Sequence, residues 1–445
     1  MAAPTLNAAE KVALSSADPE FIVNTLAACS LPSGNNWLPA THAAIRGIEK
    51  DHKPGGNAPI APLALAEYLA IATPTHCADG WSYLSRALHS YLVGDPHSAW
   101  HFAYYAELRA AQAILSSLGC GAFNSWNCTL DSAGTIRPAG THPTHVMVWL
   151  ALGFLCNNSL KASTAISAAT SVLGHSLPEV IQYAYPGQRA TSTSANWLGE
   201  WLFDLETGID DKAFRNKCSY NPHVVTAHRA NVGESVELVC SLWEALEPSP
   251  GAAFLEIDKH ILRSALRKAA VDHLLLKNST RPPTEAEQEE ELREAHMRIC
   301  AGAPTFASIP AEFIANVVAT DHPLLHHAKD YSSAPDTPRP VLTRAALLLR
   351  VASGMAMNLF RDAGQSTNLG FWLDDLAERQ GIVSNRSEIP TNRSELYLDC
   401  AIASEALERR YAGGLTSLAA LMSHREVKSH LVSQAERVVQ WGILP

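Results

Sequence analysis

The sequence lacks any uninterrupted apolar run of about 18 residues, the length that a helix needs to cross a lipid bilayer. Its first 21 residues contain neither the basic cluster nor the apolar stretch of a secretory signal peptide. We therefore expect a cytoplasmic protein that has no membrane-spanning segment and no membrane partner.

Paired cysteines are also missing. The nine cysteines are scattered and odd in number, and no two of them form a CxxC pair. This pattern argues against a zinc ribbon and against a disulfide framework. Free, buried thiols in a reducing compartment fit the pattern better.

Several catalytic signatures are absent as well. The chain has no GxxxxGK[ST] phosphate loop, no GxSxG elbow and no HExxH motif, and Gly119 and Gly121 lack the third glycine of a dinucleotide-binding turn. Common NTPase, esterase, metallopeptidase and dehydrogenase classes are thereby disfavoured. The net charge of −10 argues against a protein that coats DNA non-specifically, although it leaves room for a local basic pocket.

Apolar residues at helical spacing dominate what is present. Hydrophobic residues make up 47% of the chain and charged residues only 18%, so broad helix faces must be buried. Strand signals are few, and residues 60–118 alone favour two or three helices. We predict a mainly α protein, a multi-helix bundle with a second, C-terminal helical domain. The expected parts are an N-terminal helical segment (1–59), a central helical domain (60–277), a charged helix and linker (278–302) and the C-terminal domain (303–445).

The helix expected to start at Pro96 and to end before Gly119 carries two charged residues within an apolar run. Glu107 is surrounded by alanines, leucine and aromatic residues, and a buried carboxylate needs a partner. An arginine on a neighbouring helix would make Glu107 structural. A perturbed carboxylate beside Arg109 would instead suit acid–base chemistry.

The same helix carries His97 and His101, whose spacing allows two rings to face one ion. A zinc peptidase would have a glutamate between them, and here Ser98, Ala99 and Trp100 intervene. With 19 histidines in the chain, such pairs also arise by chance. We therefore expect no metal or other cofactor, and a metal-dependent hydrolase using this pair stays as an alternative.

The loop before His145 is a second position that could bind a negatively charged group. Thr144 is expected to cap the helix that follows, which places His142 and His145 near the positive end of that helix. Such a position suits an anion or a phosphate. The alternative is an ordinary capping loop.

The segment from Arg215 to His223 contains the most suggestive short pattern. An acidic pair, Asp210 and Asp211, precedes Arg215 and Asn216. Tyr220 and His223 follow them in the sequence. This arrangement resembles the signature of the HEPN superfamily, helical proteins of prokaryotic toxin and antiviral systems, in which an arginine, a polar residue and a histidine follow one another. Seven residues separate Arg215 from His223, one more than that signature allows.

The resemblance implies a nucleic-acid-binding protein that cleaves RNA without a metal, in antiviral defence or a toxin system. In such proteins the arginine holds the phosphate and the histidine handles the proton of the ribose 2′-hydroxyl. The alternative is a non-catalytic helical scaffold that binds a partner subunit or a second copy of itself. The expected site comprises two phosphate-binding residues, two candidates for proton transfer and two supporting residues: Arg215 and Asn216, Tyr220 and His223, and Glu107 and Arg109.

Overall fold

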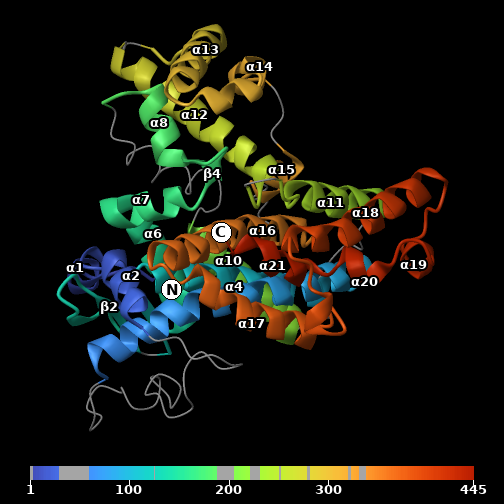
Figure 1. Cartoon of the computed structure of the whole chain (residues 1–445), viewed down its shortest axis with the longest axis horizontal. Coiled ribbons are helices and arrows are strands. Elements are labelled where there is room, and N and C mark those ends of the chain that lie inside the picture. Colours follow the sequence, from blue (N-terminus) through green and yellow to red (C-terminus); the bar gives the residue numbers. More distant parts are fainter. Residues whose placement is uncertain are drawn as a thin grey trace.

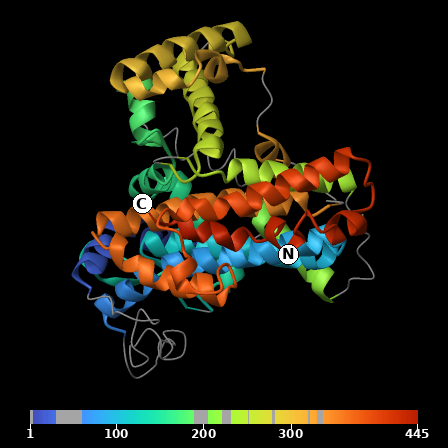
Figure 2. The same cartoon turned by 45° about the vertical axis from the view of Figure 1, so that its right-hand side comes forward.

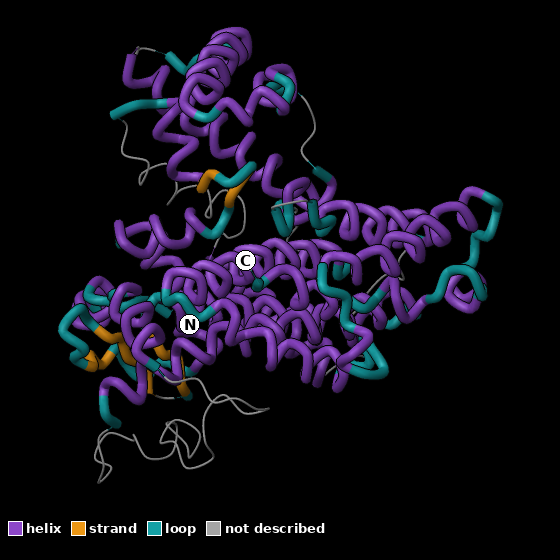
Figure 3. Tube along the Cα trace, in the orientation of Figure 1, coloured by secondary structure: helices purple, strands orange, loops and turns teal. Residues whose placement is uncertain are grey.

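The protein is mainly α-helical, as the sequence predicts, with a few short strands (Figure 3). A computed structural model describes residues 4–29, 60–124, 126–187, 205–220, 231–249, 252–277, 281–318, 322–329 and 337–444.

Three long helices form the centre of the molecule. They are α4 (Pro62–Leu92), α5 (Pro96–Ser117) and α16 (Arg339–Asp362), and each packs against the other two. Helices α6 (Thr144–Asn158) and α10 (Leu205–Tyr220) also pack against α5. Helix α5 therefore touches every other helix of this central bundle.

Helix α4 continues through Pro74, where the sequence favoured separate helices. Proline removes one backbone hydrogen bond from a helix. Two threonine hydroxyls beside it bond to the preceding turn, Thr73 to the Leu69 carbonyl at 3.0 Å and Thr75 to the Ile71 carbonyl at 2.9 Å. Burial of α4 against α5 and α16 holds both halves of the helix on one axis.

Helix α16 is almost entirely buried. It is the one helix in the described ranges that is long and apolar enough to cross a membrane, yet 94% of its apolar window lies inside the protein, and core helices pass the same test. It packs on α4 and α5, so the chain after residue 303 contributes to the central bundle.

One end of the bundle carries a small sheet and the N-terminal helices. Strands β1 (Cys120–Phe123), β2 (Trp126–Leu130) and β3 (Ile136–Pro138) pair antiparallel in that order. Gly119, with φ of 82°, turns the chain from α5 into β1, a conformation that favours glycine. Helices α1 (Ala8–Ser15) and α2 (Pro19–Ala28) lie beside this sheet (Figure 1).

An arm projects from the bundle in both ribbon views (Figures 1 and 2). A bidentate ion pair at 2.6 Å between Asp258 of the arm and Arg350 of α16 ties it to the bundle. Charged helix α13 presents a largely solvated face, as expected, but its Glu291 is buried beside Arg298 and Lys277. The arm consists of α8 (Leu177–Ala184), α12 (Leu255–Lys277), α13 (Glu285–Gly302), η2 (Pro304–Ser308) and α14 (Ala311–Ala315), with α7 (Leu160–Ala168), β4 (Ser171–Val172) and β5 (His175–Ser176) at its base.

The remaining elements pack on α16, on α4 and on one another. They are α11 (Val232–Ala245), α15 (Pro323–Ala328), α17 (Ser366–Arg379), η3 (Arg386–Glu388), η4 (Arg393–Leu396), α18 (Tyr397–Ala412), α19 (Leu418–Ser423), α20 (Ser429–Val432), η5 (Ala435–Val438) and α21 (Val439–Gly442).

Candidate functional site

Helix α5 carries the candidate site, and its different faces pack against different helices. Its start follows the predicted signals: the Asp95 side chain accepts a hydrogen bond from the Ser98 amide at 3.1 Å, and Pro96 occupies the first turn. Because α4, α6, α10 and α16 all pack against α5, polar side chains on different faces meet different partners.

Glu107 lies on the closed face. Its Oε1 is 3.3 Å from Nε of Arg344, and the same guanidinium also contacts the carboxylate of Asp211 on α10. Burial, together with the negative charge of Asp211, raises the pKa of Glu107 well above its usual value. The arginine partner that the sequence required is thus Arg344, and this carboxylate cluster joins α5, α10 and α16.

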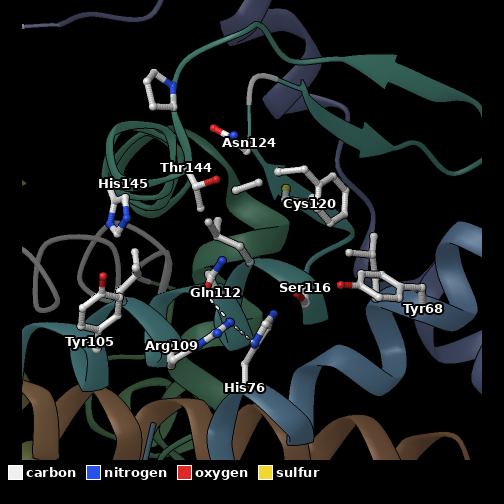
Figure 4. A pocket seen from close by; sticks show the side chains of 17 residues that line it. Tyr68, His76, Tyr105, Arg109, Gln112, Ser116, Cys120, Asn124, Thr144 and His145 are labelled. Atoms are coloured by element: carbon white, nitrogen blue, oxygen red, sulfur yellow. Dashed lines mark hydrogen bonds between the residues drawn. The ribbon is translucent and has the colours of Figure 1, made fainter. Parts of the chain in front are cut away.

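Arg109 lies on the opposite side of α5, at a cavity of about 450 Å³. Residues of α4, α5, β1 and the start of α6 line this cavity (Figure 4). We call it the α5 cavity. Among its described lining residues none is an aspartate or a glutamate. They are Tyr68, Leu69, His76, Tyr105, Leu108, Arg109, Gln112, Leu115, Ser116, Cys120, Gly121, Ala122, Phe123, Asn124, Pro143, Thr144 and His145.

Arg109 is held mainly by neutral groups. Its Nη1 donates to His76 Nδ1 at 3.1 Å and to Gln112 Oε1 at 3.3 Å (Figure 4). Asp79, half-exposed, lies 3.7 Å from Nε. Because arginine can only donate, His76 accepts through Nδ1 and the neutral ring carries its proton on Nε2. Burial first, and then the Arg109 charge, lower the pKa of His76 to about 3.

Gly80 permits the close approach of α4 to its neighbours. A Cβ atom at this position would lie 2.5 Å from Cδ2 of Leu349 and 3.4 Å from Cβ of Arg109. The absence of that atom lets His76 and Arg109 meet across the α4–α5 contact.

The N-terminus of α6 also faces the cavity. Thr144 is the first residue of the helix and does not cap it; Pro143 occupies the capping position, where it offers no side-chain hydrogen bond. The amides of Val146 and Met147 bond to the Pro143 carbonyl. The amides of Thr144 and His145 have no partner in the described ranges, so two donors remain at the positive end of the helix.

A buried amide fixes the loop that leads into α6. Asn127 donates through Nδ2 to the carbonyls of Gly140 at 3.2 Å and His142 at 2.9 Å. The His142 ring lies 3.5 Å from the Glu10 carboxylate of α1. Of the two histidines expected near this helix end, His145 is therefore the one that lines the cavity.

Ser116 adds a hydroxyl donor to the same cavity. Its side chain is 5% exposed and lines the wall, and no hydrogen bond of its hydroxyl occurs within the described part of the chain (Figure 4). A hydroxyl that faces the cavity can donate a hydrogen bond to a ligand or accept one from it.

Arg215 approaches α5 from α10, next to the cavity. Its guanidinium carbon lies 5.1 Å from the ring centres of both Tyr104 and Tyr105, and Tyr105 also lines the cavity. Arg215 is 6% exposed, and no carboxylate pairs with it among the described residues. Aromatic faces stabilise such a cation without neutralising it.

His145 stands between these cations. Its Nδ1 is 3.0 Å from the Tyr104 hydroxyl. Burial is the largest cause that lowers its pKa, to about 4, and the charges of Arg215, Lys212 and Arg109 lower it further. Three cations therefore act on one neutral imidazole at the edge of the α5 cavity.

The predicted site residues do not all meet. Arg109 lines the α5 cavity with His145, Arg215 packs on Tyr104 and Tyr105 beside it, and Glu107 belongs to the carboxylate cluster. Tyr220 ends α10 and is 74% exposed. Asn216 is partly exposed on α10, and His223 lies outside the described residues.

The histidine pair on α5 is a possible metal site by its spacing alone. His101 contacts the Ser219 hydroxyl through Nδ1 at 2.7 Å. Within the described ranges, no group of three or more histidine, cysteine, aspartate or glutamate side chains could hold a metal ion.

Sequence reasoning missed His76, Ser116 and Lys212. His76 is one of 19 histidines and occurs in no motif, while Ser116 and Lys212 are ordinary helix residues. Only the packing of α4 and α10 on α5 and α6 brings these three residues near the site.

Comparisons of the chain with protein-family models, with curated proteins and with solved structures gave no match. The resemblance to HEPN proteins is therefore neither supported nor contradicted by relatives. The geometry of the α5 cavity carries the functional argument.

Proposed function

We propose that this protein binds a small organic anion in the α5 cavity. The observation that carries the proposal is Arg109 at the wall of a cavity whose described lining contains no carboxylate, together with the two α6 amides that have no partner within the described ranges. The half-exposed Asp79, 3.7 Å from Nε of Arg109, forms a solvent-screened ion pair with it, so an anionic ligand in the cavity would add a closer counter-charge.

The donors around the cavity suit an anion. Arg109 offers a guanidinium, His76 an Nε2 proton, and the start of α6 two amides that have no partner within the described ranges. Helix N-termini and guanidinium groups are common binding elements for carboxylates and phosphates. A volume of about 450 Å³ lies within the usual range for small-molecule sites.

Isothermal titration with sulfate and with benzoate tests this function. Arg109→Gln should weaken binding roughly 10- to 100-fold, the effect of losing one charge-assisted hydrogen bond. The matched control is Arg281→Gln on the arm, which removes a half-exposed arginine paired with Glu287 and should leave binding unchanged. Equal affinities of the wild type and Arg109→Gln would overturn the proposal.

A second candidate is RNA binding and cleavage of the HEPN kind, in antiviral defence or a toxin system. The observation that favours it is Arg215, a cation without a carboxylate partner among the described residues, close enough to lower the pKa of His101 after the larger effect of burial. In this function Arg215 would hold a phosphate and His223 would transfer the proton. Incubation with RNA tests it, and cleavage that Arg215→Ala leaves unchanged would contradict this assignment.

A further inference from the structure

The α5 cavity has two unlike ends. Helices α4 and α5 form an antiparallel hairpin, so His76 lies opposite Arg109, and Tyr68, about two turns earlier in α4, lies on the wall with Ser116, about two turns later in α5. Two helical turns correspond to roughly 11 Å. The charged end and the far end of the cavity are therefore separated by the length of a small molecule.

The far end is apolar and aromatic. Leu69, Leu115 and Phe123 line it together with Tyr68, whose ring centre is 5.9 Å from that of Phe123. Phe123 stacks on Trp126 with the ring centres 5.2 Å apart and the planes 14° from parallel. Flat rings held in place by other flat rings form a wall that suits a planar, apolar body.

Gly121 fixes the position of the Phe123 ring. A Cβ atom at Gly121 would lie 2.4 Å from Cε2 of Phe123, closer than any two such atoms can approach. The ring therefore lies directly over a position where β1 has no side chain, and this contact sets the wall of the far end.

We infer that the ligand is an organic anion with an aromatic body, bound with its charged group at Arg109 and its ring beside Phe123. This inference rests on the proposed function and names the ligand class. The Ser116 hydroxyl, unpartnered in the described part of the chain, adds one feature at the far end: it suits a single hydrogen-bonding substituent on the ring.

Matched probes separate the parts of the ligand. Propionate supplies the charge alone, 3-phenylpropionate adds the ring, 3-(4-hydroxyphenyl)propionate adds a hydroxyl, and 3-phenylpropan-1-ol keeps the ring without the charge. We expect 3-phenylpropionate to bind at least about tenfold more tightly than propionate, because burying a ring contributes more than 1.4 kcal/mol. The alcohol should bind more weakly than 3-phenylpropionate, and 2-phenylethyl phosphate tells whether phosphate can replace carboxylate.

Two variants locate the ring. Phe123→Ala should bring 3-phenylpropionate down to the affinity of propionate, while leaving propionate itself unchanged. Phe123→Leu keeps apolar volume at the strand and serves where the alanine variant folds poorly; it should lose part of the preference for the ring. Ser116→Ala should abolish any preference for the hydroxylated probe.

The outcomes distinguish this inference from the proposed function. If propionate and 3-phenylpropionate bind equally, and Arg109→Gln weakens both, then the cavity binds anions and the inference of an aromatic ligand is wrong. If neither sulfate nor any of the carboxylates binds, both the function and the ligand class are overturned. If the ring preference survives both Phe123 variants, the ring binds elsewhere and the inference fails.

Discussion

Two arginines on opposite sides of α5 are held in contrasting ways. Arg344 is buried between two carboxylates, Glu107 and Asp211, in a cluster closed to solvent. Arg109, 30% exposed, is held by a neutral imidazole and an amide at the edge of a cavity without lining carboxylates in the described ranges. A charge paired with buried carboxylates supports the fold, whereas a charge whose carboxylate partner, Asp79, is half-exposed and 3.7 Å away can also bind a ligand.

The largest expected effect is a difference between the two arginines in what each contributes to the free energy of unfolding. Arg344→Met leaves Glu107 and Asp211 buried together without a cation, and we expect a loss of about 3–5 kcal/mol in the free energy of unfolding. Arg109→Met removes a partly exposed group with mostly neutral partners and should cost less than about 1 kcal/mol. Urea denaturation followed by circular dichroism measures both.

A double variant provides the control for this first prediction. Glu107→Gln in the Arg344→Met background removes one of the two buried carboxylates and should recover part of the lost stability. Similar losses for Arg344→Met and Arg109→Met would contradict the distinction between the two sites.

The pH dependence of stability tests the buried cluster of Glu107, Asp211 and Arg344. Because the pKa of Glu107 is raised above 4.5 in the folded protein, the folded state keeps a proton that the unfolded chain releases above that pH. The stability of the wild type should therefore fall as pH rises from 4.5 toward the folded-state pKa. Glu107→Gln stays neutral and should flatten this dependence, unlike the exposed control Glu285→Gln, when urea midpoints are measured from pH 4.5 to 8.

On the open side, the smallest expected effect concerns His145. Its pKa of about 4 in the free protein rises when an anion neutralises the surrounding cations, so binding takes up a proton. Sulfate, whose charge is constant over this range, should bind several-fold more tightly at pH 4.5 than at pH 7. His145→Gln should remove the dependence, and an unchanged pH profile in that variant would show that another group titrates.

Local sequence signals predicted the helix that carries the candidate site. Asp95 and Pro96 mark the start of α5 and Gly119 its end, because capping and left-handed turns depend on adjacent residues. The need of Glu107 for a partner also followed from its apolar neighbours. The mainly α fold followed from apolar residues at helical spacing.

Other features depend on residues far apart in the chain. Continuation of α4 through Pro74 contradicts the local signal, since packing against α16 outweighs the cost of one lost hydrogen bond. Charge and proline content do not reveal that α16 returns to the central bundle. Thr144 was expected to cap α6, and Pro143 occupies that place instead.

The sequence by itself determined the helices, their ends and the requirement that buried charges find partners, because these depend on residues within one or two turns. Only the tertiary structure decided which partners they find. Arg344 meets the buried Glu107 across 237 positions of the chain, while Arg109 meets the neutral His76 and the half-exposed Asp79. Side-chain complementarity between distant helices makes that choice, and it separates a charge that supports the fold from one that faces a cavity.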